Sequence, residues 1–442
     1  MKKKFFYTVL IFFFVLFFLI LGIITSGNYD KQNSLILLLK KMIPSSMARD
    51  IRDKVFYIPR TINRNKFLEL QLDKYEQDLE GNLFFDEKLK KNGLNYQVKK
   101  FFLPFHSLDL SLGWQAQENS KRAHYLEIID DKVLVISGEA ETIFFNKKNL
   151  MTEKLNQKYV SNNLKKIVEK RGNIFAGVRD LLYYDDFIYT SVVEITPEGG
   201  TLNVYKAQKN FNFLNFSILF ENKETYSKGY SLQSGGRLER FKDNNILLSI
   251  GFFNEHDLAQ DDSSLFGKII SINKSNGDFR ILSKGHRNPQ GLYFWKEKNI
   301  IVNSEHGPKG GDEINFNNLN ESSIKNFGWP ISSYGEAYSK KKKEIFEKKG
   351  YLKKSHSEFG FEEPYKYFTP SIGISEIILN NNTLYVSSLR AESIYIINVK
   401  NPNQIIRLKL NNRIRDIKYD FENKTFYLIF ENVPSFGFLK ML

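Results

Sequence analysis

The sequence predicts an all-β protein, a six-bladed β-propeller, because one hairpin pattern recurs six times along the chain. Each copy has a short apolar run, a turn rich in Asp, Asn or Lys, and a second run of β-forming residues. The copies begin at Leu126, Leu181, Leu238, Leu292, Ile377 and Ile417. Closing six such blades into a ring protects the strand edges that an open sheet would expose. A pair of β-sandwiches is the alternative, but it gives no reason for six copies of one hairpin.

Length and composition agree with a large closed domain. The 442 residues are 42% hydrophobic and 15% aromatic, enough to bury a large core. The chain has no cysteine, which excludes disulfides, thiolate metal sites and a cysteine nucleophile. The net charge is +14, but the lysines are scattered apart from a run at Lys340–Lys343, which reads as a solvated insertion. Because no nucleic-acid-binding motif occurs either, we do not expect nucleic acid as a partner.

The N-terminal segment predicts a transmembrane helix. Three lysines precede an uncharged stretch from Phe5 to Ile24, which is long enough to cross a hydrocarbon core of about 30 Å. The segment is either a signal anchor or a signal peptide cleaved near Thr25–Gly27. The positive-inside rule places the rest of the chain on the outer, periplasmic side of the membrane. We therefore expect a membrane-anchored protein, or one secreted to the periplasm if the segment is cleaved.

The region that follows lacks the hairpin pattern. Residues 28–118 are expected to form an N-terminal extension or stalk, with a helix around Lys66–Leu79 where apolar residues recur near a 3.6-residue spacing. The sequence thus divides into a signal anchor or signal peptide at 1–27, the extension at 28–118 and the propeller at 119–442.

The densest motifs fall in the loops of the middle hairpins. Residues 285–292 read GHRNPQGL, residues 305–315 read EHGPKGGDEIN, and residues 326–330 read NFGWP. Gly, Pro, Asn and Asp at this density fix the backbone of surface loops, where propellers bind their ligands. For Pro289, Gly310 and Gly311 taken alone, tight blade connections are the preferred interpretation.

These motifs, in this order, resemble the soluble quinoprotein glucose/sorbosone dehydrogenases, the aldose sugar dehydrogenase family. The resemblance covers about Leu126 to Leu428 and is strongest from Gly235 to Gly335. It implies a six-bladed propeller that carries pyrroloquinoline quinone (PQQ) and calcium. It also implies an oxidoreductase that acts on the CH–OH group of a sugar or related alcohol and passes electrons to an acceptor that the sequence does not identify.

The resemblance also implies which residues bind the cofactors. Arg287, Asn288, Arg413 and Arg415 fall at the family's quinone-binding positions, and Arg390 replaces the usual lysine. Arginine suits a planar tricarboxylate because its guanidinium pairs with carboxylates through two hydrogen bonds and stacks on flat rings. Arg413 and Arg415 alternate along a strand, so without the flanking match we would interpret either one as a solvated residue. The backbone carbonyls of Gly307 and Pro308 are the expected calcium ligands.

The catalytic position departs from the family. The family has a histidine two residues before Gly-Gly-Arg-Leu, where this chain has Gln233. An amide cannot take the proton of the sugar hydroxyl, whereas histidine can. His256, in a nearby loop, is a candidate substitute base. The alternatives are a non-catalytic propeller that binds a sugar, quinone or protein partner, and a structural protein of the cell envelope.

Overall fold

The computed structural model describes residues 80–91, 94–105, 123–226, 233–431 and 433–441. The fold reported below is that of the unit Asp78–Leu442. The predicted segment at 1–27 and the predicted helix at Lys66–Leu79 lie outside the described residues. Among the described residues, no helix is both long enough and apolar enough to cross a membrane.

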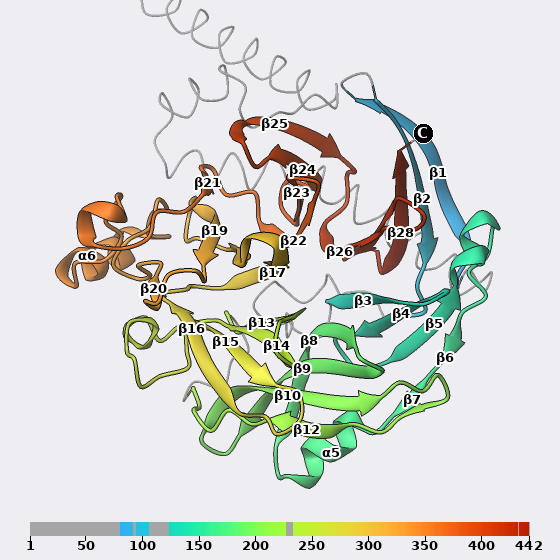
Figure 1. Ribbon diagram of the computed structural model, residues 1–442, viewed down its shortest axis with the longest axis horizontal. Coiled ribbons are helices and arrows are strands. Elements are labelled where there is room, and N and C mark those ends of the chain that lie inside the picture. The colour runs from blue at the N-terminus through green and yellow to red at the C-terminus, as the bar shows by residue number, and fades with distance from the viewer. Residues whose placement is uncertain (1–79, 92–93, 106–122, 227–232, 432, 442) are drawn as a thin grey trace, which may run out of the picture. The chain divides into compact units, whose positions relative to one another are not determined.

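Six sheets of four or five strands stand around a common centre in the described part of the chain, as Figure 1 shows. The first blade consists of β3 (His124–Ile129), β4 (Lys132–Ser137), β5 (Thr142–Asn146) and β6 (Lys158–Tyr159). The second consists of β8 (Ile174–Tyr184), β9 (Phe187–Thr196), β10 (Gly199–Gln208) and β12 (Ser217–Phe220). The third consists of β13 (Gly235–Arg240), β14 (Asn245–Ile250), β15 (Lys268–Asn273), β16 (Phe279–Lys284) and β20 (Lys325–Asn326). The fourth blade consists of β17 (Pro289–Trp295), β18 (Ile300–Glu305), β19 (Asp312–Asn318) and β21 (Lys366–Phe368). The fifth consists of β22 (Ile374–Asn380), β23 (Thr383–Ser388), β24 (Ser393–Asn398) and β25 (Asn401–Lys409).

The sixth blade joins the two ends of the described chain. It contains β26 (Ile414–Asp420), β27 (Thr425–Phe430) and β28 (Ser435–Met441), followed outward by β2 (Leu94–Phe102) and β1 (Leu83–Lys91). The antiparallel pairing of β2 with β28 closes the ring. The innermost strands of neighbouring blades contact one another all the way round, including β26 and β3. The predicted six-bladed propeller is therefore confirmed, and the six predicted hairpins are its six inner strand pairs.

The predicted boundary at residue 119 is wrong in one respect. The sequence predicts an extension at residues 28–118, yet β1 and β2 lie within that range and are the outer strands of the sixth blade. The physical reason is that ring closure requires an early segment to pair with the last strand. The charged sequence of β1, LFFDEKLKK, hides the strand, because this edge strand has mostly exposed side chains.

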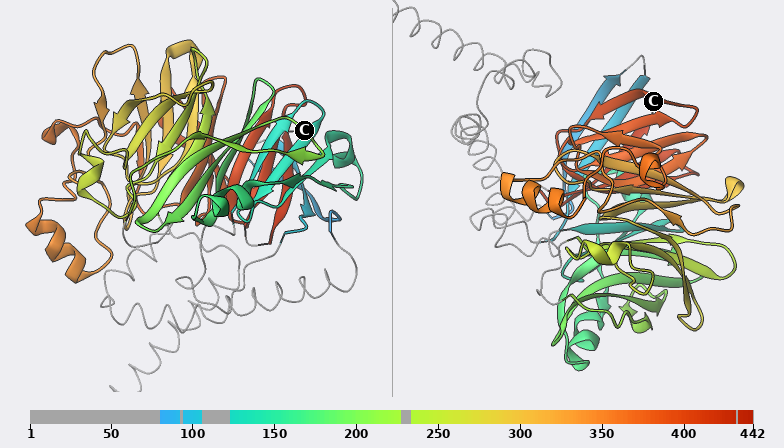
Figure 2. Two further views of the ribbon diagram at one scale, coloured as in Figure 1. Left: turned by 90° about the horizontal axis from the view of Figure 1, so that it is seen from below. Right: turned by 90° about the vertical axis from the view of Figure 1, so that its left-hand side faces the viewer.

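The remaining described elements are short. A parallel pair, β7 (Ser161–Asn162) and β11 (Phe213–Leu214), lies near α5 (Leu164–Lys170), and α6 (Lys340–Lys348) lies in the lysine-rich insertion. Four 3₁₀ turns complete the list: η1 (Lys147–Met151), η2 (Asp257–Ala259), η3 (Lys296–Lys298) and η4 (Ser357–Phe359). The turned views in Figure 2 show the blades side by side and α6 at the outer edge of the propeller.

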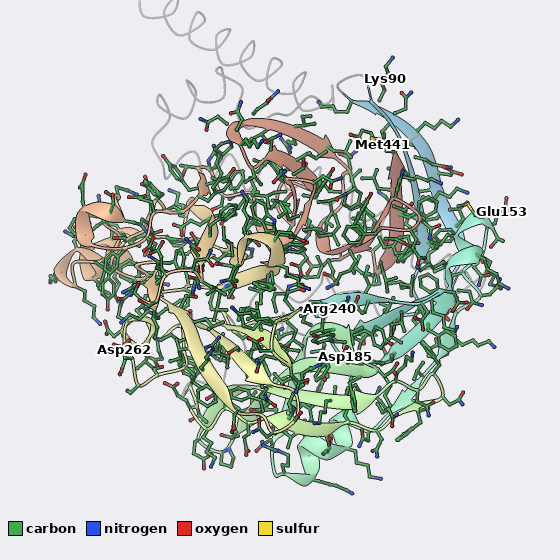
Figure 3. All side chains as sticks on the ribbon, viewed as in Figure 1. Lys90, Glu153, Asp185, Arg240, Asp262 and Met441 are labelled. Carbon is green, nitrogen blue, oxygen red and sulfur yellow. The ribbon has the colours of Figure 1, made fainter. Side chains whose placement is uncertain are left out.

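Apolar side chains fill the spaces between neighbouring blades, as the sticks in Figure 3 show. One buried cluster lies at each of the six blade interfaces. The second strand of a blade lies between two other strands and is covered on both faces; in β27 every residue is buried. Each fully buried Leu, Ile, Val or Phe side chain contributes about 1.5–3 kcal/mol, so the interfaces hold the ring together.

Buried carboxylates add a second connection between blades. Asp416 accepts the Leu126 N–H at 2.8 Å, and Asp180 accepts the Leu238 N–H at 2.7 Å. In both pairs the acid and the amide belong to inner strands of adjacent blades. Because the inner strands cannot form a regular ladder with one another, these acids satisfy backbone donors that would otherwise be buried without a partner.

Candidate functional site

The topology explains why the predicted site residues gather at one end of the propeller. In each inner hairpin the first strand starts beside the end of the second, as Pro289 opposite Glu305 and Ile414 opposite Phe430 illustrate. The loops before the first strands and after the second strands therefore meet at a single end. All predicted site residues lie in these loops or within two residues of these strand ends: Gln233, His256, Arg287, Asn288, Gly307, Pro308, Arg390, Arg413 and Arg415.

Arg287 is a buried arginine that forms no ion pair among the described residues. Its side chain is 7% exposed, and one Nη donates to the backbone carbonyl of His306 at 2.8 Å. The Nε atom is buried and has no hydrogen-bond partner in the part of the chain that the structure describes. Burial lowers the pKa of Arg287, although Tyr338, Asp312 and Glu305 oppose the shift. A buried guanidinium with an unused donor is the group that an anionic ligand would pair with.

Two aromatic rings flank this guanidinium. Its central carbon lies 5.5 Å from the Phe252 ring centre and 5.2 Å from that of Trp329, within the range of cation–π attraction. The nearby acid Glu305 is already committed, because one oxygen accepts the Arg287 N–H at 2.7 Å and the other lies 3.2 Å from His286 Nδ1. Glu305 therefore shapes the loop and acts on the guanidinium through its charge, without forming an ion pair with it.

Side-chain amides connect Asn288, which follows Arg287 in the chain, to Arg415 and to the backbone beside Gln233. The Asn288 side-chain oxygen accepts the Gly235 N–H at 3.2 Å and the Gln290 amide at 3.1 Å. The Gln290 oxygen in turn accepts an Nη of Arg415 at 2.8 Å. The structure thus brings together Asn288 and Arg415 with the backbone next to Gln233.

Gln233 is held by its backbone in a left-handed conformation with φ of 64°. Its carbonyl accepts the Phe253 N–H at 3.1 Å, and a Cβ on Gly251 would overlap that carbonyl oxygen. The side-chain oxygen of Gln233 is buried and accepts no hydrogen bond from the described residues. The position therefore offers an unused acceptor, but an amide has no basic lone pair for proton abstraction.

The other predicted arginines have different environments. Arg413 and Arg415 share the buried carboxylate of Glu431, with Nε–O distances of 3.0 and 2.6 Å. They are paired and largely buried, so the solvated alternative for them is wrong. Arg390 is exposed, and its backbone N–H donates to the Ile372 carbonyl at 3.1 Å.

The Gly307–Pro308 turn is built around Asp312. One carboxylate oxygen of Asp312 accepts the Gly307 N–H at 3.2 Å, and the other accepts the Gly373 N–H at 2.7 Å. A Cβ at Gly307 would overlap the Gly311 carbonyl, so only glycine fits. The Gly307 carbonyl accepts no hydrogen bond from the described residues, and the Pro308 carbonyl accepts only a long one, 3.4 Å, from Ser371. Free carbonyls of this kind are suitable ligands for calcium.

His256 lies in a cage of aromatic rings beside Arg287. Its ring centre is 5.0 Å from that of Phe252, 5.2 Å from Phe346, 5.6 Å from Trp329 and 5.9 Å from Tyr351. Burial, and then the charge of Arg287, lower the pKa of His256 to about 4. The imidazole is therefore neutral at pH 7, the form that accepts a proton, but it is a weak base.

Sequence reasoning missed several residues of this end. His306 Nε2 lies 2.6 Å from the Ile374 carbonyl, and burial lowers its pKa, opposed by Asp312 and assisted by Arg415 and Arg287. The sequence feature that points to His306 is its position in the EHGP motif. No sequence motif points to Glu431 or Tyr338, because Glu431 directly follows an ordinary apolar strand and Tyr338 lies in the insertion.

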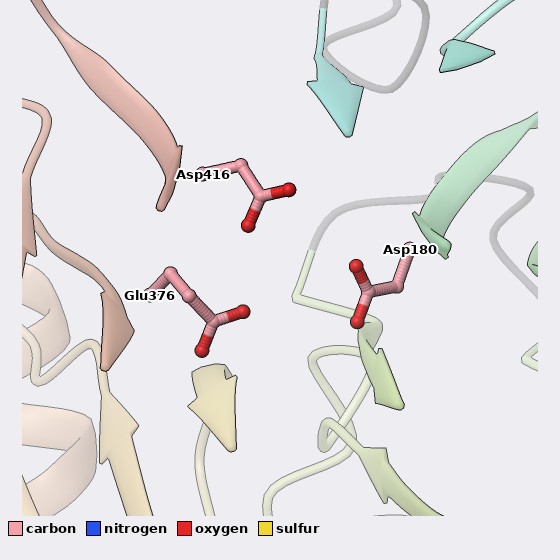
Figure 4. Close-up of side chains that lie close together, drawn as sticks. All are labelled: Asp180, Glu376 and Asp416. Carbon is pink, nitrogen blue, oxygen red and sulfur yellow. The ribbon is translucent and has the colours of Figure 1, made fainter. Parts of the chain in front are cut away.

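A second polar cluster lies on the inner strands, and an arginine of the same chain pairs with its acids. Asp180, Glu376 and Asp416 point toward one another, as Figure 4 shows, in an arrangement that would suit a metal ion. One Nη atom of Arg237 lies 3.0, 3.0 and 3.1 Å from their oxygens. Burial raises the pKa of Glu376 to about 8, although Arg237 opposes the shift. Arg237 therefore occupies the position that a cation would take.

Comparison with known proteins gives a consistent result. A family model described as glucose/sorbosone dehydrogenase matches residues 143–434. Aldose sugar dehydrogenase YliI of Escherichia coli (strain K12) is 28% identical over 276 residues, which covers 55% of this chain and 71% of the relative.

Solved structures share the fold. A crystal structure of glucose dehydrogenase aligns with a TM-score of 0.60 at 20% identity, covering 73% of this chain and 97% of the other. The PQQ-bound aldose sugar dehydrogenase of Streptomyces coelicolor aligns with a TM-score of 0.55 at 17% identity, covering 78% of this chain and 98% of the other.

Proposed function

This chain belongs to the glucose/sorbosone dehydrogenase family, and we propose that it is a PQQ-dependent dehydrogenase that oxidises the CH–OH group of an aldose sugar or a related alcohol. The observation that carries the proposal is Arg287, a buried arginine with no ion pair among the described residues and an unused Nε. Such a group is costly unless an anionic ligand neutralises it, and PQQ carries three carboxylates.

The surrounding residues fit this cofactor. Arg287, Asn288, Arg390, Arg413 and Arg415 would hold its carboxylates and carbonyls, and the free carbonyls of Gly307 and Pro308 would hold calcium. Arg413 and Arg415 both bond to the Glu431 carboxylate, which holds the two guanidinium groups next to each other. When bound, the quinone supplies the two-electron acceptor for sugar oxidation.

The chain's own residues must handle the hydroxyl proton. Gln233 stands where the family has histidine, and its amide can orient a hydroxyl group through the unused oxygen but cannot remove a proton. We propose His256 as the substitute base, because it is neutral at pH 7 and lies against the same two rings as Arg287. A base with a pKa near 4 predicts slow turnover.

Replacing Gln233 with histidine tests this function. Histidine is among the residues that tolerate left-handed backbone, so Gln233→His is compatible with the φ of 64°. With PQQ, calcium, an aldose panel and a small uncharged quinone as acceptor, we expect turnover to rise about 100-fold or more. No turnover in either protein, despite measured PQQ binding, would contradict the dehydrogenase proposal.

One observation favours a second function. Because Gln233 removes the expected base, the same site would serve a propeller that binds a quinone or sugar without turnover. Tight PQQ binding without sugar oxidation in both the native chain and Gln233→His would support this alternative.

We also propose that residues 5–24 anchor the protein in the membrane, or direct its secretion, with the propeller on the periplasmic side. The support is the uncharged length of this stretch and the three lysines before it. Protease added to spheroplasts should digest the propeller, and the anchored form should sediment with membranes. Complete protection of the propeller from the added protease would contradict this topology.

A further inference from the structure

The insertion that follows the FGWP motif carries an unusual density of positive charge. Eight lysines and two glutamates lie between Lys340 and Lys354. Lys343 pairs with Glu347 at 3.7 Å, Lys349 pairs with Asp257 at 2.9 Å, and Lys354 donates to backbone carbonyls. The other five lysines are exposed and make no ion pair among the described residues. We call these five the lysine cluster: Lys340, Lys341, Lys342, Lys348 and Lys353.

The insertion is built onto the rim of the candidate site. Phe346 and Tyr351 contact the ring of His256, and the Tyr351 hydroxyl and Lys349 both bond to Asp257 in the loop after His256. Tyr338, just before α6, interacts with the buried Arg287 guanidinium. The helix itself is well defined, because the Ser339 hydroxyl accepts the Lys342 N–H at 3.2 Å and Gly350 ends it with φ of 72°. The lysine cluster is therefore fixed next to the site.

The exposed face of α6 lacks the features of a lipid-binding helix. Such helices bury a broad apolar face in the headgroup region. Here Phe346 points toward His256, and Ile345, 45% exposed, is the one exposed apolar residue of the helix. A charged surface without an apolar face is suited to an acidic protein, which it attracts by charge complementarity without deep burial.

We propose that the lysine cluster docks an acidic electron-acceptor protein at the mouth of the site. This inference rests on the proposed function, since it places the acceptor where electrons would leave. Each sugar oxidation converts CH–OH to C=O and releases two electrons and two protons. Two ferric haem groups take one electron each and become ferrous, and the protons pass to the solvent. The partner that we propose is a one-electron redox protein with an acidic surface, and a ferric haem protein serves as the probe.

Charge-matched probes test this proposal directly. Native mitochondrial cytochrome c is basic, and its lysine-succinylated form is acidic with the same haem. The test variant is Lys340→Gln with Lys341→Gln and Lys348→Gln, since glutamine keeps a high helix propensity. The control is Lys148→Gln with Lys166→Gln and Lys170→Gln, three exposed lysines around η1 and α5 with the same change in net charge.

Two readouts separate this inference from the proposed function. The first is binding of oxidised succinylated cytochrome c to the full chain without cofactor or sugar, at low salt. The second is the rate of its reduction by the loaded enzyme, compared with reduction of a small uncharged quinone. We expect the test variant to lose about tenfold in both binding and cytochrome reduction, and 1 M salt to abolish the difference. The control variant and the quinone rate should stay unchanged.

Three results would overturn the inference. Equal binding of native and succinylated cytochrome c would show that charge does not drive the docking. An equal loss in the control variant would show that the overall charge of +14 acts and not the lysine cluster. If only vesicles containing phosphatidylglycerol bind differently to the native chain and the test variant, the cluster serves a membrane. Absence of quinone reduction with intact, lysine-dependent cytochrome binding would instead remove the proposed function and leave a docking surface.

Discussion

Arg237 and Arg287 are both buried arginines close to the start of inner strands, yet the chain treats them in opposite ways. Arg237 is surrounded by the carboxylates of Asp180, Glu376 and Asp416, all within 3.1 Å, and they raise its pKa although burial opposes the shift. Arg287 has no ion pair among the described residues, two flanking rings and an unused Nε.

The difference separates structure from function within one residue type. A buried charge that the protein neutralises itself contributes to the fold, whereas a buried charge left without a counter-ion anticipates a ligand. By this criterion Arg237 joins the blades, and Arg287 belongs to the binding site. Arg413 and Arg415, two cations that share one acid, stand between these cases.

The largest expected effect comes from Arg237→Met. Removing the guanidinium leaves three buried carboxylates facing one another, so we expect a loss of about 3–5 kcal/mol in the free energy of unfolding. Urea unfolding followed by intrinsic fluorescence measures this loss. An unchanged midpoint would show that the cluster is not a structural ion pair.

Glu431→Gln sharpens the intermediate case. It removes the carboxylate to which both Arg413 and Arg415 bond. We expect destabilisation of about 1.5–3 kcal/mol, together with tighter binding of anionic ligands such as PQQ. Thermal unfolding and PQQ titration test the two parts, and weaker PQQ binding would mean that Glu431 positions these arginines for the cofactor.

A smaller effect is expected from pH at the His256 cage. Because the pKa of His256 is lowered to about 4 from its ordinary value of 6.5, the unfolded chain binds a proton more readily than the folded one between these values. Stability should therefore fall as the pH drops from 6.5 to 4. His256→Phe keeps an aromatic ring in the cage and should show a shallower fall. Identical pH profiles for both proteins would contradict the burial of this imidazole.

The smallest effect on folding is expected from Arg287→Met, the matched partner of Arg237→Met. The substitution loses one hydrogen bond to His306 but also removes a buried charge without a counter-ion. We expect the free energy of unfolding, measured in urea without ligand, to change by less than about 1 kcal/mol. A loss as large as that of Arg237→Met would mean that Arg287 is structural, and the comparison would fail.

Much of the architecture could be predicted from the sequence because hydrophobic periodicity repeats with each blade. The six inner hairpins lie where the repeats place them. The hairpin of β1 and β2 could not be recognised, because an edge strand with charged residues lacks the apolar alternation. Its pairing with β28 depends on ring closure, a property of the whole chain.

The candidate site, too, could be predicted from the sequence only in part. Motif loops identified Arg287, Asn288, Gly307 and Pro308, which the structure places at one end of the propeller. Motifs could not reveal that Glu431 pairs with Arg413 and Arg415, or that the insertion covers His256 with Phe346 and Tyr351. These contacts join residues from distant parts of the chain, and no local pattern encodes them.

Calorimetric titration of the full chain with PQQ in the presence of calcium tests the central claim most directly. We predict calcium-dependent binding to the native chain and an affinity weaker by about 1.5–3 kcal/mol for Arg287→Met, with an unchanged stability before ligand is added. Equal PQQ affinity of the native chain and Arg287→Met, or no binding by either, would contradict the assignment of this buried arginine to a quinone site.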